Sequence, residues 1–163
     1  MVEVAPVRVL IVDNQSECED IVSVFLRRWG NEVRTVFGGL FPMNEARDFA
    51  PELVMVHVDR PEFDALSLVK RFRRRHSFGS VPLIAVSMDC DPESRSAGIA
   101  AGFDRWLVKP IASEDLCGLL ADARATIAMP DGLAQRTIDN VALFDALKLD
   151  QDNQRRAERL DRP

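Results

Sequence analysis

A histidine and an aspartate stand at the end of an apolar stretch in the middle of the chain. Residues 53–58 read L-V-M-V-H-V, and Asp59 follows directly. A short run of branched apolar residues is typical of a strand buried on both faces of a parallel sheet. In open α/β sheets, ligands and reacting groups lie just beyond the carboxyl ends of the strands. We therefore expect His57 and Asp59 to lie where a site would be, with an imidazole and a carboxylate that could bind a metal ion.

Four other stretches are read as strands. The run at 7–12 is closed by Asp13 and Asn14, and a shorter one covers 32–36. The run at 81–87 ends in Ser87, and the run at 105–108 is followed by Lys109.

The segments between these runs carry helix signals. Ser16 and Glu19 have the spacing of a capping box, apolar residues follow at helical spacing, and Gly30 ends the pattern. Helices are expected at about 16–29, 40–50, 63–76, 91–102 and 113–129. Five strands that alternate with five helices indicate a doubly wound parallel sheet with helices on both faces.

Composition narrows the class of protein. The chain has 163 residues, a net charge of −5 and 47% hydrophobic residues, which indicates one globular domain with a modest appendage and argues against a polyanion-binding surface. Its three cysteines form no ligand cluster, as expected of a reducing compartment. No signal peptide and no apolar run near 18 residues is found, so we expect a cytoplasmic protein that does not span a membrane.

Taken together, the motifs resemble those of the receiver domains of bacterial two-component response regulators. They are Val12-Asp13-Asn14, His57 with Pro61 and Asp64, Ser87, Ala101-Gly102-Phe103-Asp104, and Trp106-Leu107-Val108-Lys109-Pro110. The resemblance covers about residues 6–129 and implies a flavodoxin-like sheet of order 2-1-3-4-5. It also implies that Ser87 and Lys109 bind phosphoryl oxygens and that Trp106 is the switch aromatic.

Two positions depart from the family pattern. The family places two adjacent acidic residues after strand one and a phosphoacceptor aspartate at the end of strand three, which together hold magnesium. Here Asn14 and His57 replace two of these three carboxylates, and only Asp13 remains. Magnesium prefers oxygen ligands, whereas imidazole suits zinc, copper or nickel better. We expect magnesium binding to be weak or absent, with no metal or other cofactor required.

Three roles for His57 follow from this departure. The favoured one is a neutral side chain that fills the old pocket and hydrogen-bonds to Ser87 or Asp13. Alternatively, Asp59 contributes a carboxylate to a reshaped metal site, or His57 is itself phosphorylated. Lys109 is expected to pair with Asp13 or Asp59, because an unpaired buried ammonium is costly. For Trp106 a fixed packing role is favoured over a switch.

A dense basic run, K-R-F-R-R-R-H, occupies residues 70–76. It is read as the solvated end of a helix, where cations favour the helix dipole. The alternative is a patch for nucleic acid or an acidic partner, and the acidity of the chain makes nucleic acid the less favoured occupant.

Residues 130–163 lie outside the resemblance, which gives a receiver-like domain at 1–129 and a helical extension with a charged end. The extension is read as a helix that packs back on the domain, or else as a linker to a partner or output domain. We predict an atypical receiver, or pseudo-receiver, that is not an enzyme and signals by binding a protein such as a histidine kinase or output protein. The alternatives are a receiver still phosphorylated through Asp59 or Asp13, and a dimerising input domain that associates through residues 91–129 or the C-terminal helix.

Overall fold

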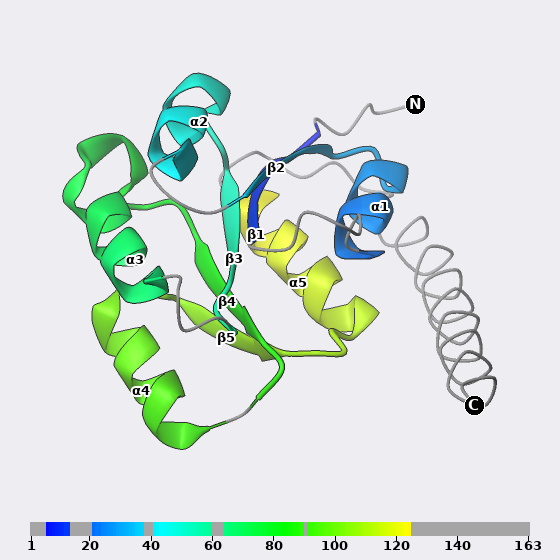
Figure 1. Cartoon of the computed structure of the whole chain (residues 1–163). Helices are drawn as coiled ribbons and strands as arrows, with labels where there is room; N and C mark the ends of the chain where they lie inside the picture. The colour runs from blue at the N-terminus through cyan, green and yellow to red at the C-terminus, as the bar shows by residue number, and fades with distance from the viewer. Residues whose placement is uncertain (1–5, 14–20, 38–40, 60–63, 90, 125–163) are drawn as a thin grey trace, which may run out of the picture.

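Strands and helices alternate along the chain in the computed structural model (Figure 1). The structure describes residues 6–13, 21–37, 41–59, 64–89 and 91–124. The strands are β1 (Arg8–Asp13), β2 (Glu32–Phe37), β3 (Leu53–His57), β4 (Leu83–Ser87) and β5 (Arg105–Val108). The helices are α1 (Ile21–Arg28), α2 (Phe41–Phe49), α3 (Ala65–Arg74), α4 (Pro92–Ala101) and α5 (Ser113–Arg124), with a short 3₁₀ turn, η1 (His76–Phe78), after α3.

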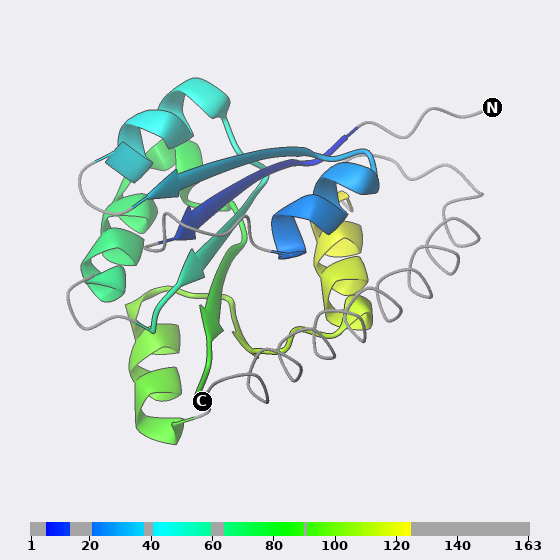
Figure 2. The same ribbon diagram turned by 45° about the vertical axis from the view of Figure 1, so that its right-hand side comes forward.

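The five strands form one parallel sheet of order β2-β1-β3-β4-β5. Helices α1 and α5 cover one face, and α2, α3 and α4 cover the other (Figures 1 and 2). This arrangement confirms the predicted doubly wound fold and its strand order. The carboxyl ends of β1, β3, β4 and β5 therefore lie along one edge of the sheet.

Two apolar layers, one on each face of the sheet, make up the core. Alternate residues of each strand point to opposite faces, so Val9 and Ile11 pack beneath α1 and α5 while Leu10 and Val12 pack beneath α2 and α3. β3 and β4 are buried along their whole length, as expected of central strands covered on both faces.

The element bounds differ slightly from those expected. β4 begins at Leu83 rather than Val81, and α3 ends at Arg74 because Arg75 adopts an extended conformation before η1. Asn14, the Ser16–Glu19 capping box and the extension at 130–163 lie outside the described residues. Among the described helices, none is long and apolar enough to cross a bilayer.

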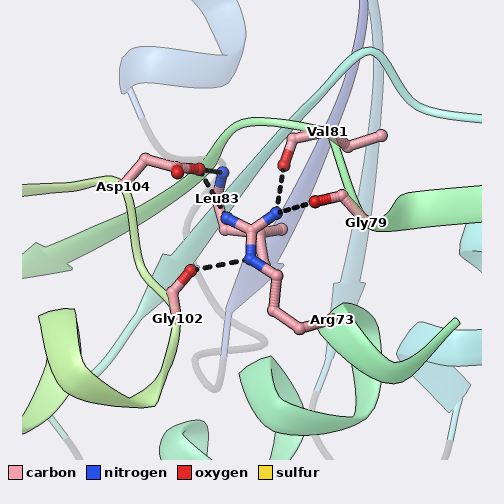
Figure 3. Close-up of polar contacts among 6 residues, drawn as sticks. All are labelled: Arg73, Gly79, Val81, Leu83, Gly102 and Asp104. Atoms are coloured by element: carbon pink, nitrogen blue, oxygen red, sulfur yellow. Dashed lines mark hydrogen bonds and ion pairs between the residues drawn. The ribbon is translucent and has the colours of Figure 1, made fainter. Parts of the chain in front are cut away.

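Arg73 joins α3 to three neighbouring segments (Figure 3). Its Nε donates to the carbonyl of Gly102 at 2.8 Å, and one terminal nitrogen donates to the carbonyls of Gly79 and Val81 at 3.0 and 2.9 Å. The other nitrogen contacts Asp104 Oδ2 at 2.6 Å, and the same oxygen accepts the Leu83 N–H at 2.7 Å. The expectation of a wholly solvated basic run is therefore wrong for Arg73, whose guanidinium ties α3 to β4 and to the loop before β5.

Candidate functional site

Four neighbouring strands deliver the predicted site residues to the carboxyl edge of the sheet. Asp13 is the last residue of β1, His57 of β3 and Ser87 of β4, while Lys109 directly follows β5. The parallel register pairs His57 with Val86 and Ser87 with Val108, so His57 and Ser87 end adjacent strands. The structure thus brings the predicted residues to one edge, except Asn14, which it does not describe.

His57 is buried at the end of β3, with 7% of its surface exposed. The ladder between β3 and β4 continues past it, because the Val58 N–H donates to the Val86 carbonyl at 3.0 Å. The pairing with β4 consequently holds the backbone on either side of His57 along the chain.

Asp59 receives two hydrogen bonds from the end of β4. The Ser87 hydroxyl donates to Asp59 Oδ1 at 2.7 Å, and the Met88 N–H donates to the same oxygen at 2.6 Å. The Ser87 oxygen in turn accepts the Asp89 N–H at 3.1 Å. The Ser87 hydroxyl hydrogen therefore goes to Asp59, whose Oδ1 has lone pairs for both donors.

Lys109 is half-buried beside Ser87, and its backbone N–H donates to the Ser87 carbonyl at 2.7 Å. Its peptide bond to Pro110 is cis. Among the described residues no ion pair joins Lys109 to Asp13 or Asp59, in contrast to the expected pairing. The physical reason on the Asp59 side is that this carboxylate faces the donors of Ser87 and Met88.

Trp106 packs edge-on against Phe103, with ring centroids 6.2 Å apart and planes at 85°. Its six-membered ring lies directly over Gly98 of α4, where an added Cβ would be only 2.4 Å from Trp106 Cζ3. The indole N–H is buried and finds no acceptor among the residues that the structure describes. Sequence reasoning missed Gly98, although a glycine inside a helix is unfavourable enough to indicate a close approach at that position.

The donors at this edge do not resemble a magnesium site. Within the described part of the chain, no three His, Cys, Asp or Glu side chains gather closely enough to hold a metal ion. Asp59 directs one oxygen to Ser87 and Met88, and His57 offers nitrogen where magnesium favours oxygen.

The parallel 2-1-3-4-5 sheet, with a serine ending β4 and a lysine and a proline after β5, defines the class of flavodoxin-like receiver modules. A family model described as the response regulator receiver domain matches residues 9–121. The chain belongs to the response regulator receiver family, whose members are signalling domains of two-component systems.

Individual relatives agree with this assignment. The chain is 27% identical to the "DNA-binding dual master transcriptional regulator RpaA" of Synechocystis over 78% of its own length and 52% of the relative's. It is 29% identical to the transcriptional regulatory protein PrrA of Mycobacterium leprae over 83% of its length and 56% of the relative's. The chain thus spans about half the length of these curated relatives. The chemotaxis response regulator CheY4 of Vibrio cholerae superposes with a TM-score of 0.64 at 27% identity, over 73% of this chain and 99% of that one.

Proposed function

We propose that this chain is a pseudo-receiver, which signals by binding another protein and does not depend on phosphorylation of an aspartate. The observation that carries the proposal is the pair of hydrogen bonds from Ser87 and Met88 to Asp59. In the family the hydroxyl after strand four binds a phosphoryl oxygen. Here the Asp59 carboxylate accepts the hydrogen bond from the Ser87 hydroxyl, so Ser87 has a partner without a phosphoryl group.

The residue at the phosphoacceptor position supports the same conclusion. Phosphoryl transfer to a receiver needs an anionic oxygen nucleophile in line with phosphorus. His57 supplies a buried imidazole at that place, with neither the charge nor the geometry of a carboxylate.

The charge balance also disfavours magnesium. At an effective dielectric near 20, two unit charges about 4 Å apart attract by about 4 kcal/mol, and the attraction to a doubly charged ion is about twice that. Replacing two carboxylates by Asn14 and His57 removes two such interactions. We therefore propose that magnesium binding is weak or absent and that the domain is not an enzyme.

The proposed partner is a signalling protein, either a histidine kinase or an output protein, in the cytoplasm. DNA binding is stated for the Synechocystis relative, which is about twice as long as the stretch it shares with this chain. For the chain itself nucleic acid is not proposed. Association of two copies through residues 91–129 or the C-terminal helix is the alternative, tested by light scattering with and without residues 130–163.

Incubation of the full chain with acetyl phosphate and magnesium, followed by intact mass measurement, tests the proposal. We expect no gain of a phosphoryl group, while a receiver with an intact acidic triad treated in parallel gains one. Stoichiometric phosphorylation would overturn the proposal. Repeating the reaction with Asp59→Asn would then show whether Asp59 is the acceptor, which is the second candidate function.

A further inference from the structure

Exposed cations at the carboxyl end of α3 form a distinct surface, here called the α3 basic surface. Its cations are Lys70, Arg71, Arg74 and Arg75, His76 lies next to them, and all five side chains are exposed. Among the described residues none of them has a carboxylate partner, whereas Arg8, Arg34, Arg47, Arg73 and Arg105 each contact one. The surface therefore concentrates positive charge that forms no ion pair within the described part of a chain whose net charge is −5.

The helix dipole explains only part of this concentration. Cations are favourable in the last turn of a helix, and the effect falls off within that turn. Lys70 lies before the last turn of α3 and is four residues from Arg74, while Arg71 is three residues from Arg74. Residues at these spacings are neighbours on a helix, so their like charges repel. An anionic group lying across the surface would remove this repulsion.

The backbone that presents these cations is fixed from below. Phe72 and Phe78 are buried and pack edge-on with ring centroids 5.5 Å apart. The Arg75 N–H donates to the Phe72 carbonyl at 3.1 Å, and the Phe78 N–H donates to the Arg75 carbonyl at 3.0 Å. The hydrogen bonds of Arg73 anchor the same turn (Figure 3). A rigid base of this kind lowers the ordering cost of binding.

The α3 basic surface lies at the end of the sheet opposite His57. α3 runs back from the carboxyl edge, and Arg73 near its end contacts the Val81 carbonyl just before β4 begins (Figures 1 and 3). Ser87 is the last residue of β4, and at the usual rise of a strand it lies about 13 Å from Leu83, the first residue of that strand. A partner on the α3 basic surface would leave the carboxyl edge uncovered.

We propose that the α3 basic surface docks an acidic segment of a partner protein. Arginine pairs with carboxylates through two parallel hydrogen bonds, and three of the four cations are arginines. The helical part of the surface runs from Lys70 to Arg74 and is about 6 Å long. A peptide segment that carries a few carboxylates is enough to cover this length. Specific duplex binders neutralise about six to ten phosphates, and the acidic remainder of this chain opposes such a ligand. This docking does not depend on the chemistry at His57 and stands or falls separately from the proposed function.

Fluorescence anisotropy with a labelled 12-residue Glu/Asp peptide and the full-length chain tests the proposal. A Gln/Asn peptide of the same pattern and a labelled duplex DNA serve as comparison probes. The variant is Arg71→Gln/Arg74→Gln. Its matched control is Arg28→Gln/Arg95→Gln, which removes the same charge from two other exposed arginines without a carboxylate partner among the described residues.

We expect the acidic peptide to bind with an affinity that falls as salt is raised. The Arg71/Arg74 variant should bind it at least about tenfold more weakly, and the control pair should bind within about twofold of the unaltered chain. Absent binding, or equal loss in both variants, would overturn the proposal. So would duplex DNA that binds more tightly than the peptide and depends on Arg71 and Arg74, because the occupant would then be nucleic acid. Thermal unfolding of both variants establishes that each remains folded.

Discussion

Ser87 donates its hydroxyl hydrogen to Asp59 Oδ1 at 2.7 Å, across the gap between the ends of β4 and β3. The Met88 N–H reaches the same oxygen at 2.6 Å. Two donors from consecutive residues thus converge on one carboxylate oxygen, two positions beyond His57. This contact holds the end of β4 in one conformation.

A double-mutant cycle with Asp59→Asn and Ser87→Ala measures this contact. We expect a coupling free energy of about 0.5–1.5 kcal/mol, the usual net value of one hydrogen bond, because the site is only partly buried. Equilibrium unfolding in urea gives the four stabilities, and the Met88 amide resonance should move in Asp59→Asn. Asp59→Asn combined with Arg47→Gln, at an exposed site on α2, should be additive. Additivity in the Ser87 cycle as well would contradict the contact.

Gly98→Ala should destabilise the fold by about 1–3 kcal/mol, the usual range for overpacking a core. The new methyl group would meet Trp106 Cζ3 at 2.4 Å, so the indole or α4 has to move. Chemical denaturation gives the stability, and tryptophan fluorescence in a Trp29→Phe background reports the movement of Trp106.

Gly118→Ala is the matched control for that substitution. Gly118 lies in α5, and an added Cβ there meets nothing within 4 Å. Alanine is the better helix former, so this variant should be more stable by about 0.5–1 kcal/mol. Equal effects at the two glycines would show that helix propensity, and not the contact with Trp106, determines the result.

Arg73→Gln should cost about 1–3 kcal/mol of unfolding free energy. The change removes the ion pair to Asp104 and the bonds to the Gly102 and Val81 carbonyls, and the value allows for the half-exposed Asp104 carboxylate. Arg74→Gln, one residue along the same helix, should stay within about 0.5 kcal/mol of the unaltered chain because its side chain is exposed. Urea denaturation gives the free energy of unfolding of both variants. Similar losses of stability would contradict the stabilising role given to the Arg73 contacts.

The start of α4 should weaken under acid conditions. Hydrogen bonds from the Ser94 side chain and backbone N–H lower the pKa of the Asp91 carboxyl from its usual 3.8. Because the folded pKa is below the unfolded one, the cap contributes its stability above pH 3.8 and loses it as pH falls through the folded value. The protection of the Ser94 amide against hydrogen exchange, relative to its intrinsic exchange rate at each pH, should fall in that window. Asp91→Asn, an N-cap that does not titrate, should show a smaller change.

The fold could be predicted because β1, β3, β4 and β5 carry nearly continuous apolar runs. Such runs, separated by capped helices, leave few topologies for a parallel sheet, and β1 and β3 were placed within a residue of their bounds. The end of α3 was less accurate, since nothing in the run of arginines marks where Arg75 leaves the helix.

The site was only partly predictable. The residues at the strand ends followed from the pattern, but the partner of Ser87 did not, because Asp13, His57 and Asp59 all end or follow neighbouring strands. Choosing among them requires the conformation of the chain after β3. Similarly, Arg73 is one of several arginines in sequence, and only the phase of α3, set by buried Phe72, decides which one turns toward Asp104.

The bond between Ser87 and Asp59 also bears on whether the ancestral reaction of the family can be regained. Putting aspartates at positions 57 and 14 would return the missing carboxylates, yet Ser87 would still be held by a competing anion. Regaining phosphoryl transfer would therefore require a third substitution, at position 59, to release Ser87. That substitution would not help phosphoryl transfer until positions 14 and 57 had also changed. Under the proposed function, phosphoryl transfer would thus be hard to regain through single substitutions selected one at a time.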